Sequence, residues 1–305
     1  MQKDLVSIDL LTNGDVADLL ALAKDLKAVY RHGGRVDSLK GKVLGMVFAK
    51  PSLRTRVSFE VAAVQLGGHA MYITHGEVGL GKREAVSDAA RVLSRMIDGI
   101  MIRTFAHSEV EELSLHATIP VINGLTDLYH PCQALADLMT IDEHFGTLEG
   151  IRVAYIGDGN NVAHSLINSA RRTPISLAIA TPPGYEPTRE IVDAAHGEIG
   201  NRLVVGNDPA EAVKGANVVY ADVWASMGQE AERQERLARF VGFQVNDALV
   251  DAASPGAVVM HCLPAHRGEE ITDSIMDGTR AIVFQQAENR LHLQRALLHV
   301  LMGTR

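Results

Sequence analysis

Cysteine and long apolar runs are both scarce in this chain of 305 residues. Its two cysteines, Cys132 and Cys262, lie far apart, and each stands in a histidine-containing motif. That pattern is not a disulfide framework and is typical of a reducing cytosol. The longest apolar runs are shorter than the roughly 18 residues that span a bilayer, and the N-terminal residues are too acidic for a signal peptide. We therefore expect a cytoplasmic protein with no membrane partner.

Excess positive charge is also missing, since the formal net charge is -8. This balance argues against general affinity for nucleic acid or for an anionic membrane. An anion site must therefore come from a local cluster of basic residues. The GxxxxGK[ST] spacing of a nucleotide-binding P-loop is absent too, so a nucleoside triphosphate is not the expected anion.

The composition that remains, 47% apolar and 22% charged, is that of a globular protein of about two domains. Short apolar runs alternate with helical patterns twice along the chain, which implies parallel βαβ units. The strands are expected at Val43–Phe48, His69–Ile73, Gly99–Arg103, Pro120–Asn123, Ile151–Ile156, Ile175–Ala180, Leu203–Val205, Asn217–Ala221, Ala257–Cys262 and Ala281–Phe284. We predict an α/β fold of two doubly wound parallel-sheet domains joined by interdomain helices.

Helical periodicity fills the gaps between these strands. Val57, Val61 and Val64 recur at i, i+4 and i+7 before Gly67-Gly68, and Val86, Ala90, Leu93 and Ile97 recur similarly. A helix from about 131 to 145 links the domains, and a final helix from about 285 to 302 packs back on the first domain. The predicted domains are residues 1–132 and 133–284, followed by the C-terminal helix of residues 285–305.

The segment KPSLRTRVSFE, residues 50–60, places Ser52, Arg54, Thr55 and Arg56 directly after a strand. A helix start offers free backbone N–H groups and a positive dipole end. With two arginines and two hydroxyls added, it becomes a compact site for a doubly charged anion such as phosphate. The alternative is an N-capped helix with solvated arginines. For Arg56, an internal salt bridge is a separate alternative.

Further polar motifs stand at the other strand ends and helix starts, where doubly wound sheets bind their ligands. They are HPCQ at 130–133, GDGNNVAHS at 157–165, DVWASMGQE at 222–230 (with the single tryptophan), HCLPAHRGEE at 261–270 and QAENR at 286–290. GDGNNV begins like the GxGxxG fingerprint of a dehydrogenase, but Val162 replaces the third glycine. A metal site from His261, Cys262 and His266 is an alternative that their spacing disfavours.

Together with the SxRTR element at 52–56, these motifs make the whole chain resemble the transcarbamoylase family, the aspartate/ornithine carbamoyltransferases. The resemblance implies transfer of a carbamoyl group from carbamoyl phosphate to L-ornithine, a step of arginine biosynthesis. It also implies a homo-oligomer, a trimer, with no cofactor and no metal. Relatives that act on putrescine, an N-acylated ornithine or aspartate remain alternatives, as does a binding or regulatory protein without catalysis.

The resemblance also implies roles for individual residues. Those expected to bind carbamoyl phosphate are Ser52, Leu53 (through its backbone N–H), Arg54, Thr55, Gly79, Arg103, His130, Pro131, Cys132, Gln133, Cys262, Leu263 and Arg290. Those expected to bind ornithine are Asn161, Asp222, Ser226 and Met227. The catalytic set is Arg54, Arg103, His130, Gln133, Asp222 and Cys262.

Two positions depart from the family pattern. Leu53 stands where the family usually has threonine, and Gly79 stands where it often has a glutamine that reaches an adjacent subunit. A backbone contact survives the first change. At the second position, the contact between subunits falls to Lys82 or is lost.

Overall fold

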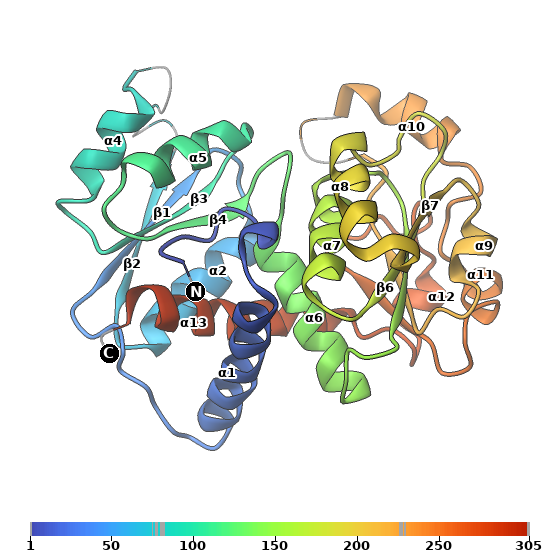
Figure 1. Cartoon of the computed structure of the whole chain (residues 1–305), viewed down its shortest axis with the longest axis horizontal. Helices are drawn as coiled ribbons and strands as arrows, with labels where there is room; N and C mark the ends of the chain where they lie inside the picture. Colours follow the sequence, from blue (N-terminus) through green and yellow to red (C-terminus); the bar gives the residue numbers. More distant parts are fainter. Residues whose placement is uncertain are drawn as a thin grey trace. The chain divides into compact units, whose positions relative to one another are not determined.

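The computed structural model describes residues 2–74, 76, 79, 83–225, 228 and 230–303. Two compact units divide this chain (Figure 1). Unit 1 runs to Met139 and resumes at Glu288, and unit 2 runs from Thr140 to Ala287. The divisions fall inside α6 (Pro131–Phe145) and α13 (Val283–Met302), so both units share these two helices.

Unit 1 is built on four parallel strands in the order β2-β1-β3-β4. Its elements are η1 (Ile8–Leu10), α1 (Asn13–Arg31), β1 (Val43–Phe48), α2 (Leu53–Gln65), β2 (His69–Thr74), α4 (Val86–Leu93), β3 (Gly99–Arg103), α5 (His107–His116) and β4 (Val121–Leu125). Helices α4 and α5 cover one face of the sheet, and α2 covers the other (Figure 1). Buried aliphatic side chains, among them Val47, Ile100, Ile102 and Val110, fill the space below α4 and α5.

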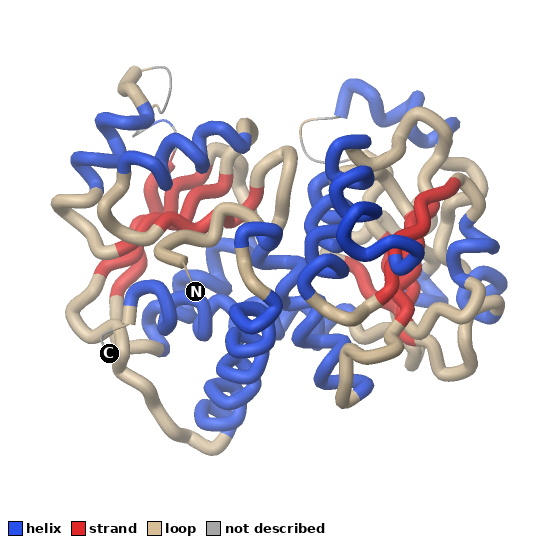
Figure 2. The backbone as a smooth tube through the Cα atoms, viewed as in Figure 1, coloured by secondary structure: helices blue, strands red, loops and turns tan. Residues whose placement is uncertain are grey.

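Unit 2 is built on five parallel strands in the order β7-β6-β5-β8-β9. Its elements are β5 (Arg152–Ile156), α7 (Asn161–Arg172), β6 (Ser176–Ala180), α8 (Arg189–Ile199), η2 (Gly200–Arg202), β7 (Leu203–Gly206), α9 (Pro209–Val213), β8 (Val218–Ala221), η3 (Glu230–Glu232), α10 (Arg233–Arg239), α11 (Asp247–Asp251), β9 (Val258–His261) and α12 (Asp273–Met276). Figure 2 shows the two sheets in red, each inside its own unit. Strands of this kind with helices on both faces confirm the predicted fold class.

One predicted strand is wrong. Residues 281–284 form no strand: Ala281 makes a single bridge to Val259, and α13 begins at Val283. A short apolar run has the same appearance in a strand and in a buried helix start, so its periodicity could not separate the two.

The face of α2 that is buried also differs from the face predicted from the spacing of its valines. Val57 and Val64 are 49% and 59% exposed, whereas Phe59, Ala62 and Ala63 are fully buried. The helix itself forms as expected, but its buried side is the one with the aromatic ring and the two small residues. Val57 and Val64 lie on the outer surface of unit 1, and Val61 is partly exposed.

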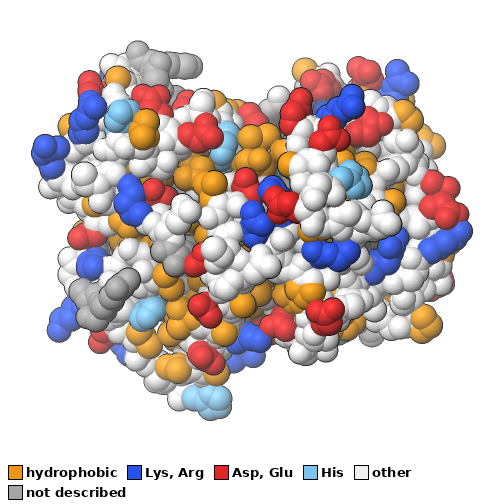
Figure 3. All heavy atoms as spheres, viewed as in Figure 1, with side chains coloured by type: hydrophobic (Ala, Val, Ile, Leu, Met, Phe, Trp, Pro, Cys, Tyr) orange, Lys and Arg blue, Asp and Glu red, His pale blue; other side chains and the backbone are white. Residues whose placement is uncertain are grey.

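No described helix is long and apolar enough to cross a membrane. Acidic and basic side chains alternate over the face seen in Figure 3, without a broad area of one sign. A charged binding site must therefore come from a local cluster of side chains, and the topology of the two sheets indicates where such a cluster can lie. Strand order reverses between β1 and β3 in unit 1 and between β5 and β8 in unit 2, and ligands of such sheets bind beyond the strand ends at these switch points.

Candidate functional site

The start of α2 lies at the switch point of unit 1, directly after β1. Ser52 caps the helix, because its Oγ accepts a hydrogen bond from the backbone N–H of Thr55 at 3.3 Å. The first turn contains no acidic residue. Its free N–H groups and dipole end therefore meet no carboxylate from the helix itself, which leaves them available to an anion.

Two more arginines join this helix start. Arg290 of α13 is 3% exposed, and its Nη2 donates to Oγ1 of the fully buried Thr55 at 2.9 Å. Arg103, the last residue of β3, is 7% exposed and pairs in register with Phe48 at the end of β1. Three elements that are distant in sequence thus bring arginines to one end of the sheet of unit 1.

His130 shows how closely these arginines converge. Burial, followed by the positive charges of Arg290, Arg103 and Arg54, holds the pKa of His130 well below its ordinary value. The imidazole is therefore neutral at physiological pH, and the neighbouring charges that act on it are all positive. We call Ser52, Arg54, Thr55, Arg103, His130 and Arg290 the arginine cluster. Such an arrangement favours a bound anion.

The first turn of α6 follows His130. The Cys132 thiol donates to the Asn123 carbonyl at 3.4 Å, and burial raises the pKa of Cys132 to about 12, so this residue is a neutral core thiol. The Gln133 side chain is also buried, and its Nε2 donates to Asp137 at 2.9 Å. Within the described part of the chain, Gln133 Oε1 has no hydrogen-bond partner and stays available to a ligand's N–H group.

Other residues expected in this unit are less informative. Pro131 begins α6, and Leu53 is 75% exposed, so only its backbone can serve a buried ligand. Gly79 has φ +64° and its carbonyl accepts from Arg83 N at 2.8 Å. Lys82 lies outside the described residues. Arg56 pairs with Glu60 at 3.4 Å and lies over the ring of Tyr72, which is the salt-bridge alternative for this arginine.

Asp222 is the centre of the polar residues in unit 2, directly after β8. Its carboxylate is buried, and it accepts hydrogen bonds from Asn160 Nδ2 at 2.8 Å, from the Tyr155 hydroxyl at 3.0 Å and from the Cys262 thiol at 3.1 Å. These partners come from β5, from the loop before α7 and from the end of β9. Asp222 therefore joins the ends of three strands at the switch point.

Tyr155 and Asn160 were not predicted from the sequence, although Asn160 stands in the quoted GDGNN segment. Burial, followed by the charges of Asp222 and Asp158, raises the pKa of Tyr155 well above its ordinary value, so the hydroxyl keeps its proton. Asn160 also caps α7, because its Oδ1 accepts from the N–H of Val162 and of Ala163. That side chain occupies the helix start on which a dinucleotide-binding fold holds its pyrophosphate. This contact argues against the dehydrogenase alternative.

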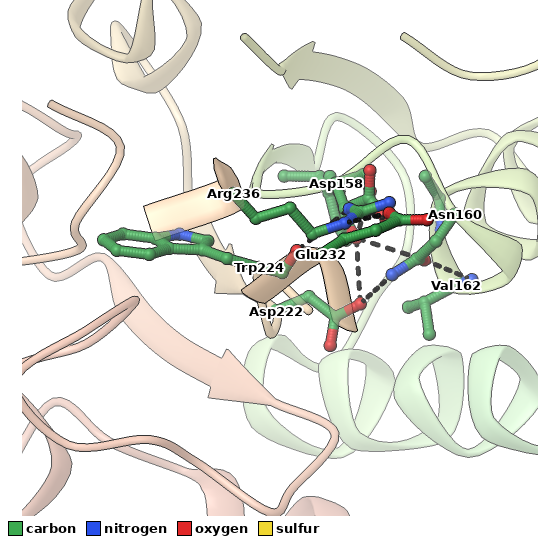
Figure 4. Close-up of polar contacts among 9 residues, drawn as sticks. Asp158, Asn160, Val162, Asp222, Trp224, Glu232 and Arg236 are labelled. Atoms are coloured by element: carbon green, nitrogen blue, oxygen red, sulfur yellow. Dashed lines mark hydrogen bonds and ion pairs between the residues drawn. The ribbon is translucent and has the colours of Figure 1, made fainter. Parts of the chain in front are cut away.

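A buried ion pair lies beside Asp222 (Figure 4). Arg236 Nη1 lies 3.0 Å from Asp158 Oδ2, Arg236 Nε donates to Glu232 at 3.0 Å, and Nη1 also donates to the Trp224 carbonyl at 3.0 Å. Burial raises the pKa of Asp158 to about 6, although Arg236 partly opposes this shift. We call Tyr155, Asp158, Asn160, Asp222, Arg236 and Cys262 the aspartate cluster. No local motif could have pointed to Arg236, which α10 supplies.

Of the remaining predicted residues of unit 2, the structure describes two and leaves two undescribed. Leu263 has φ +58°, an uncommon conformation outside glycine that is seen at functional sites, and its N–H donates to His261 Nδ1 at 2.8 Å. Asn161 is the partly exposed first residue of α7. Ser226 and Met227 lie outside the described residues.

The metal alternative drawn from His261, Cys262 and His266 does not form. His261 uses Nε2 for Glu270 at 3.0 Å and Nδ1 for Leu263 N, while the Cys262 thiol donates to Asp222. Both nitrogens and the sulfur are therefore engaged inside the protein.

Comparison with known proteins identifies relatives of both units. Residues 3–143 match the carbamoyl-P binding domain of aspartate/ornithine carbamoyltransferases, and residues 149–301 match the Asp/Orn binding domain. An ornithine carbamoyltransferase from Carboxydothermus hydrogenoformans is 53% identical over 99% of this chain and 98% of its own. An anabolic ornithine carbamoyltransferase from Pyrococcus furiosus is 50% identical, over 99% of this chain and 96% of its own. The solved structure of ornithine carbamoyltransferase from P. furiosus superimposes with a TM-score of 0.96, covering 99% of this chain and 97% of that one.

Proposed function

The chain belongs to the aspartate/ornithine carbamoyltransferase family, and from this premise we propose how its two polar clusters divide the substrates. The reaction is that of ornithine carbamoyltransferase. It transfers the carbamoyl group of carbamoyl phosphate to the side-chain amine of L-ornithine and gives L-citrulline and phosphate. We assign this step to arginine biosynthesis, which the name of the anabolic relative from P. furiosus supports.

In this proposal the arginine cluster binds carbamoyl phosphate. The phosphate lies on the N–H groups at the start of α2, with Ser52 and Thr55 as hydroxyl partners and Arg54, Arg103 and Arg290 as counter-charges. The observation that carries the assignment is the convergence of basic groups at this helix start: Arg290 donates to Thr55 at 2.9 Å, Arg103 ends the strand beside β1, and the first turn of α2 contains no acidic residue. A dianion offsets such a concentration of positive charge, whereas a neutral ligand does not.

The carbamoyl group is oriented by the side chains next to α6. A neutral His130 donates to the carbonyl oxygen, and the unpartnered Oε1 of Gln133 accepts from the carbamoyl amide. Donors held in place in this way stabilise the negative charge that grows on the oxygen as the carbon becomes tetrahedral. The Cys132 thiol donates to Asn123, so Cys132 contributes its backbone to the carbamoyl phosphate site.

The aspartate cluster binds ornithine. Its carboxylates attract the α-ammonium head, and Asp222 is held for this task by Tyr155 and Asn160. Asn161, Ser226 and Met227 complete the head-group site by family resemblance, and Cys262 and Leu263 line the reacting end. The neutral side-chain amine attacks the carbamoyl carbon, an N–C bond forms and the C–O bond to phosphate breaks. The amine nitrogen loses one proton, for which the departing phosphate is the acceptor.

The chain works as a homotrimer in this proposal. Val57 and Val64 of α2 and Met71 of β2 are each about half exposed, and β2 is an edge strand with an unpaired side. Apolar side chains beside an open strand edge are typical of surfaces that a second copy covers. Sedimentation equilibrium should give three times the mass of the chain. We place the protein in the cytoplasm, a proposal that its two free cysteines support.

One experiment tests the function and its alternatives together. Ureido product is measured with carbamoyl phosphate and, in parallel, ornithine, putrescine, N-acetylornithine or aspartate. We expect turnover with ornithine at least a hundredfold above the others, since an unmatched buried carboxylate or a missing ammonium group is strongly rejected. Preference for another amine would overturn the ornithine assignment and leave carbamoyl transfer standing, and absence of turnover with every amine would remove both.

A further inference from the structure

Three side chains that neither cluster includes gather in the loop after β9. His266, Glu269 and Glu270 each offer one ligand atom, and these atoms all lie within 4.8 Å of one another. The His266 side chain is 44% exposed and that of Glu269 is 25% exposed, whereas Glu270 is 1% exposed. The group therefore has a buried base and an accessible mouth.

Glu270 provides the observation that sets this group apart from ordinary surface acids. Its Oε1 accepts from His261 Nε2 at 3.0 Å and from the backbone N–H of His266 at 2.5 Å. Its Oε2 is buried, and among the described residues no donor is within hydrogen-bond distance of it. His266 Nδ1 lies 3.6 Å from Oε2, beyond hydrogen-bond distance. A buried carboxylate oxygen without a partner costs free energy, so this atom lacks a cation or a donor.

We propose that His266, Glu269 and Glu270 form a binding site for one divalent transition-metal ion of the Zn²⁺ type. One imidazole nitrogen and two carboxylates are a ligand set that Zn²⁺ and Co²⁺ accept, with the remaining coordination positions filled by water. Neighbouring side chains already hold the two carboxylates in place. Glu269 is also paired with Arg233, and Glu270 is held by His261. Such outer contacts orient the ligands of metal sites.

The site shares no ligand with the residues assigned to carbamoyl transfer but is connected to them. Glu270 holds His261, and His261 Nδ1 accepts from the N–H of Leu263, beside Cys262. A cation on Glu270 would therefore fix the segment that ends at Cys262, and it needs no ligand from that thiol. Binding is expected whether or not substrate is present, so the proposal does not depend on the proposed function.

The test is a titration of the full-length protein with Co²⁺, followed by visible absorption and by calorimetry. We expect one ion per chain, with the visible bands of a four- or five-coordinate N/O site. His266→Ala and Glu269→Gln should each weaken binding at least tenfold, the loss typical when a contact of a metal site is removed. Both side chains are at least partly exposed, so these variants keep the fold; circular dichroism checks this. His196→Ala, at an exposed histidine of α8, is the matched control and should bind as the wild type does.

Cys262 beside Asp222 is the competing ligand pair, because a thiol that loses its proton is a strong ligand for the same ions. Cys262→Ser separates the two. Retained stoichiometry and affinity in this variant support the proposal. Loss of binding in Cys262→Ser, with a thiolate charge-transfer band in the wild type, would overturn it, as would unchanged affinity in both His266→Ala and Glu269→Gln.

Discussion

The arginine cluster of unit 1 and the aspartate cluster of unit 2 occupy corresponding places in two similar sheets but have opposite electrostatics. Each lies where the strand order reverses. In unit 1 burial, followed by the charges of three arginines, lowers the pKa of His130, and in unit 2 burial, followed by the charges of two aspartates, raises the pKa of Tyr155. In our proposal the same architecture offers a site for an anion in one unit and for an ammonium group in the other. Backbone topology determines where the binding site lies, and the side chains beyond the strand ends determine which ligand it binds.

The largest effect on activity is expected from removing one arginine of the arginine cluster. Arg54→Ala removes a charge and a preorganised donor, a loss on the order of 3 kcal/mol in the transition state, or roughly a hundredfold or more in kcat. Carbamoyl phosphate affinity should fall as well, while ornithine binding, measured calorimetrically, stays the same. Arg56→Ala is the matched control, because Arg56 pairs with Glu60 on the surface of the same helix. Equal losses in both variants would show that the positive charge acts generally and not through the arginine cluster.

Neutralising the aspartate cluster should affect the other substrate. Asp222→Asn weakens hydrogen bonds to a charged head group, each worth roughly 1.5 to 3 kcal/mol, so the KM for ornithine should rise about ten- to a hundredfold. The KM for carbamoyl phosphate should change little. Asp193→Asn, at an exposed aspartate of α8, serves as the control. If the carbamoyl phosphate constant rises as much as the ornithine constant, the division of substrates between the clusters is wrong.

The pH dependence of activity tests whether the aspartate cluster helps to deprotonate the attacking amine. The attacking amine must be neutral, yet a free alkylammonium has a pKa of about 10.4, and a neighbouring carboxylate favours the charged form. In our proposal the aspartate cluster orients ornithine without deprotonating it. The neutral fraction of the amine rises about a hundredfold between pH 7 and pH 9, and activity at subsaturating ornithine should rise by up to the same factor. Initial rates at saturating carbamoyl phosphate measure this. Cys262→Ser should shift the profile more than it lowers the maximum, and a flat profile in the wild type would refute the account.

Stability should respond to pH with opposite sign in the two units, which is the smallest expected effect. The folded pKa of His130 is depressed, so below about pH 6.5 the unfolded chain binds a proton that the folded one does not, and acid lowers stability. The folded pKa of Asp158 is raised to about 6, so between about pH 4 and 6 the folded chain binds the extra proton, and acid raises stability.

Urea unfolding between pH 5 and pH 8 measures both contributions, each limited to about 1.4 kcal/mol per pH unit. His130→Gln should reduce the loss of stability in acid, and Asp158→Asn should increase it relative to the wild type. Changes of the same sign in the two variants would contradict the opposite environments inferred for the two clusters.

The sequence alone determined the alternation of strands and helices, the start of α2 after β1 and the start of α6 at Pro131. These features depend on local signals: apolar runs of strand length, an N-capping serine and a proline in the first helical turn. Short motifs in a fixed order also pointed to the family, because several strings that are each weak seldom agree by chance. Local signals failed where one pattern fits two structures, as at residues 281–284.

Only the tertiary structure decided which side chains meet. Arg290 contacts Thr55 across 235 positions of sequence, and Asp222 gathers Asn160 and Cys262 from 62 and 40 positions away. It also showed that Phe59 and not Val57 is buried, and that Arg236 pairs with Asp158. The physical reason is that charge, burial and hydrogen bonding act over a few ångströms of space, whereas helix and strand periodicity acts over a few residues of chain.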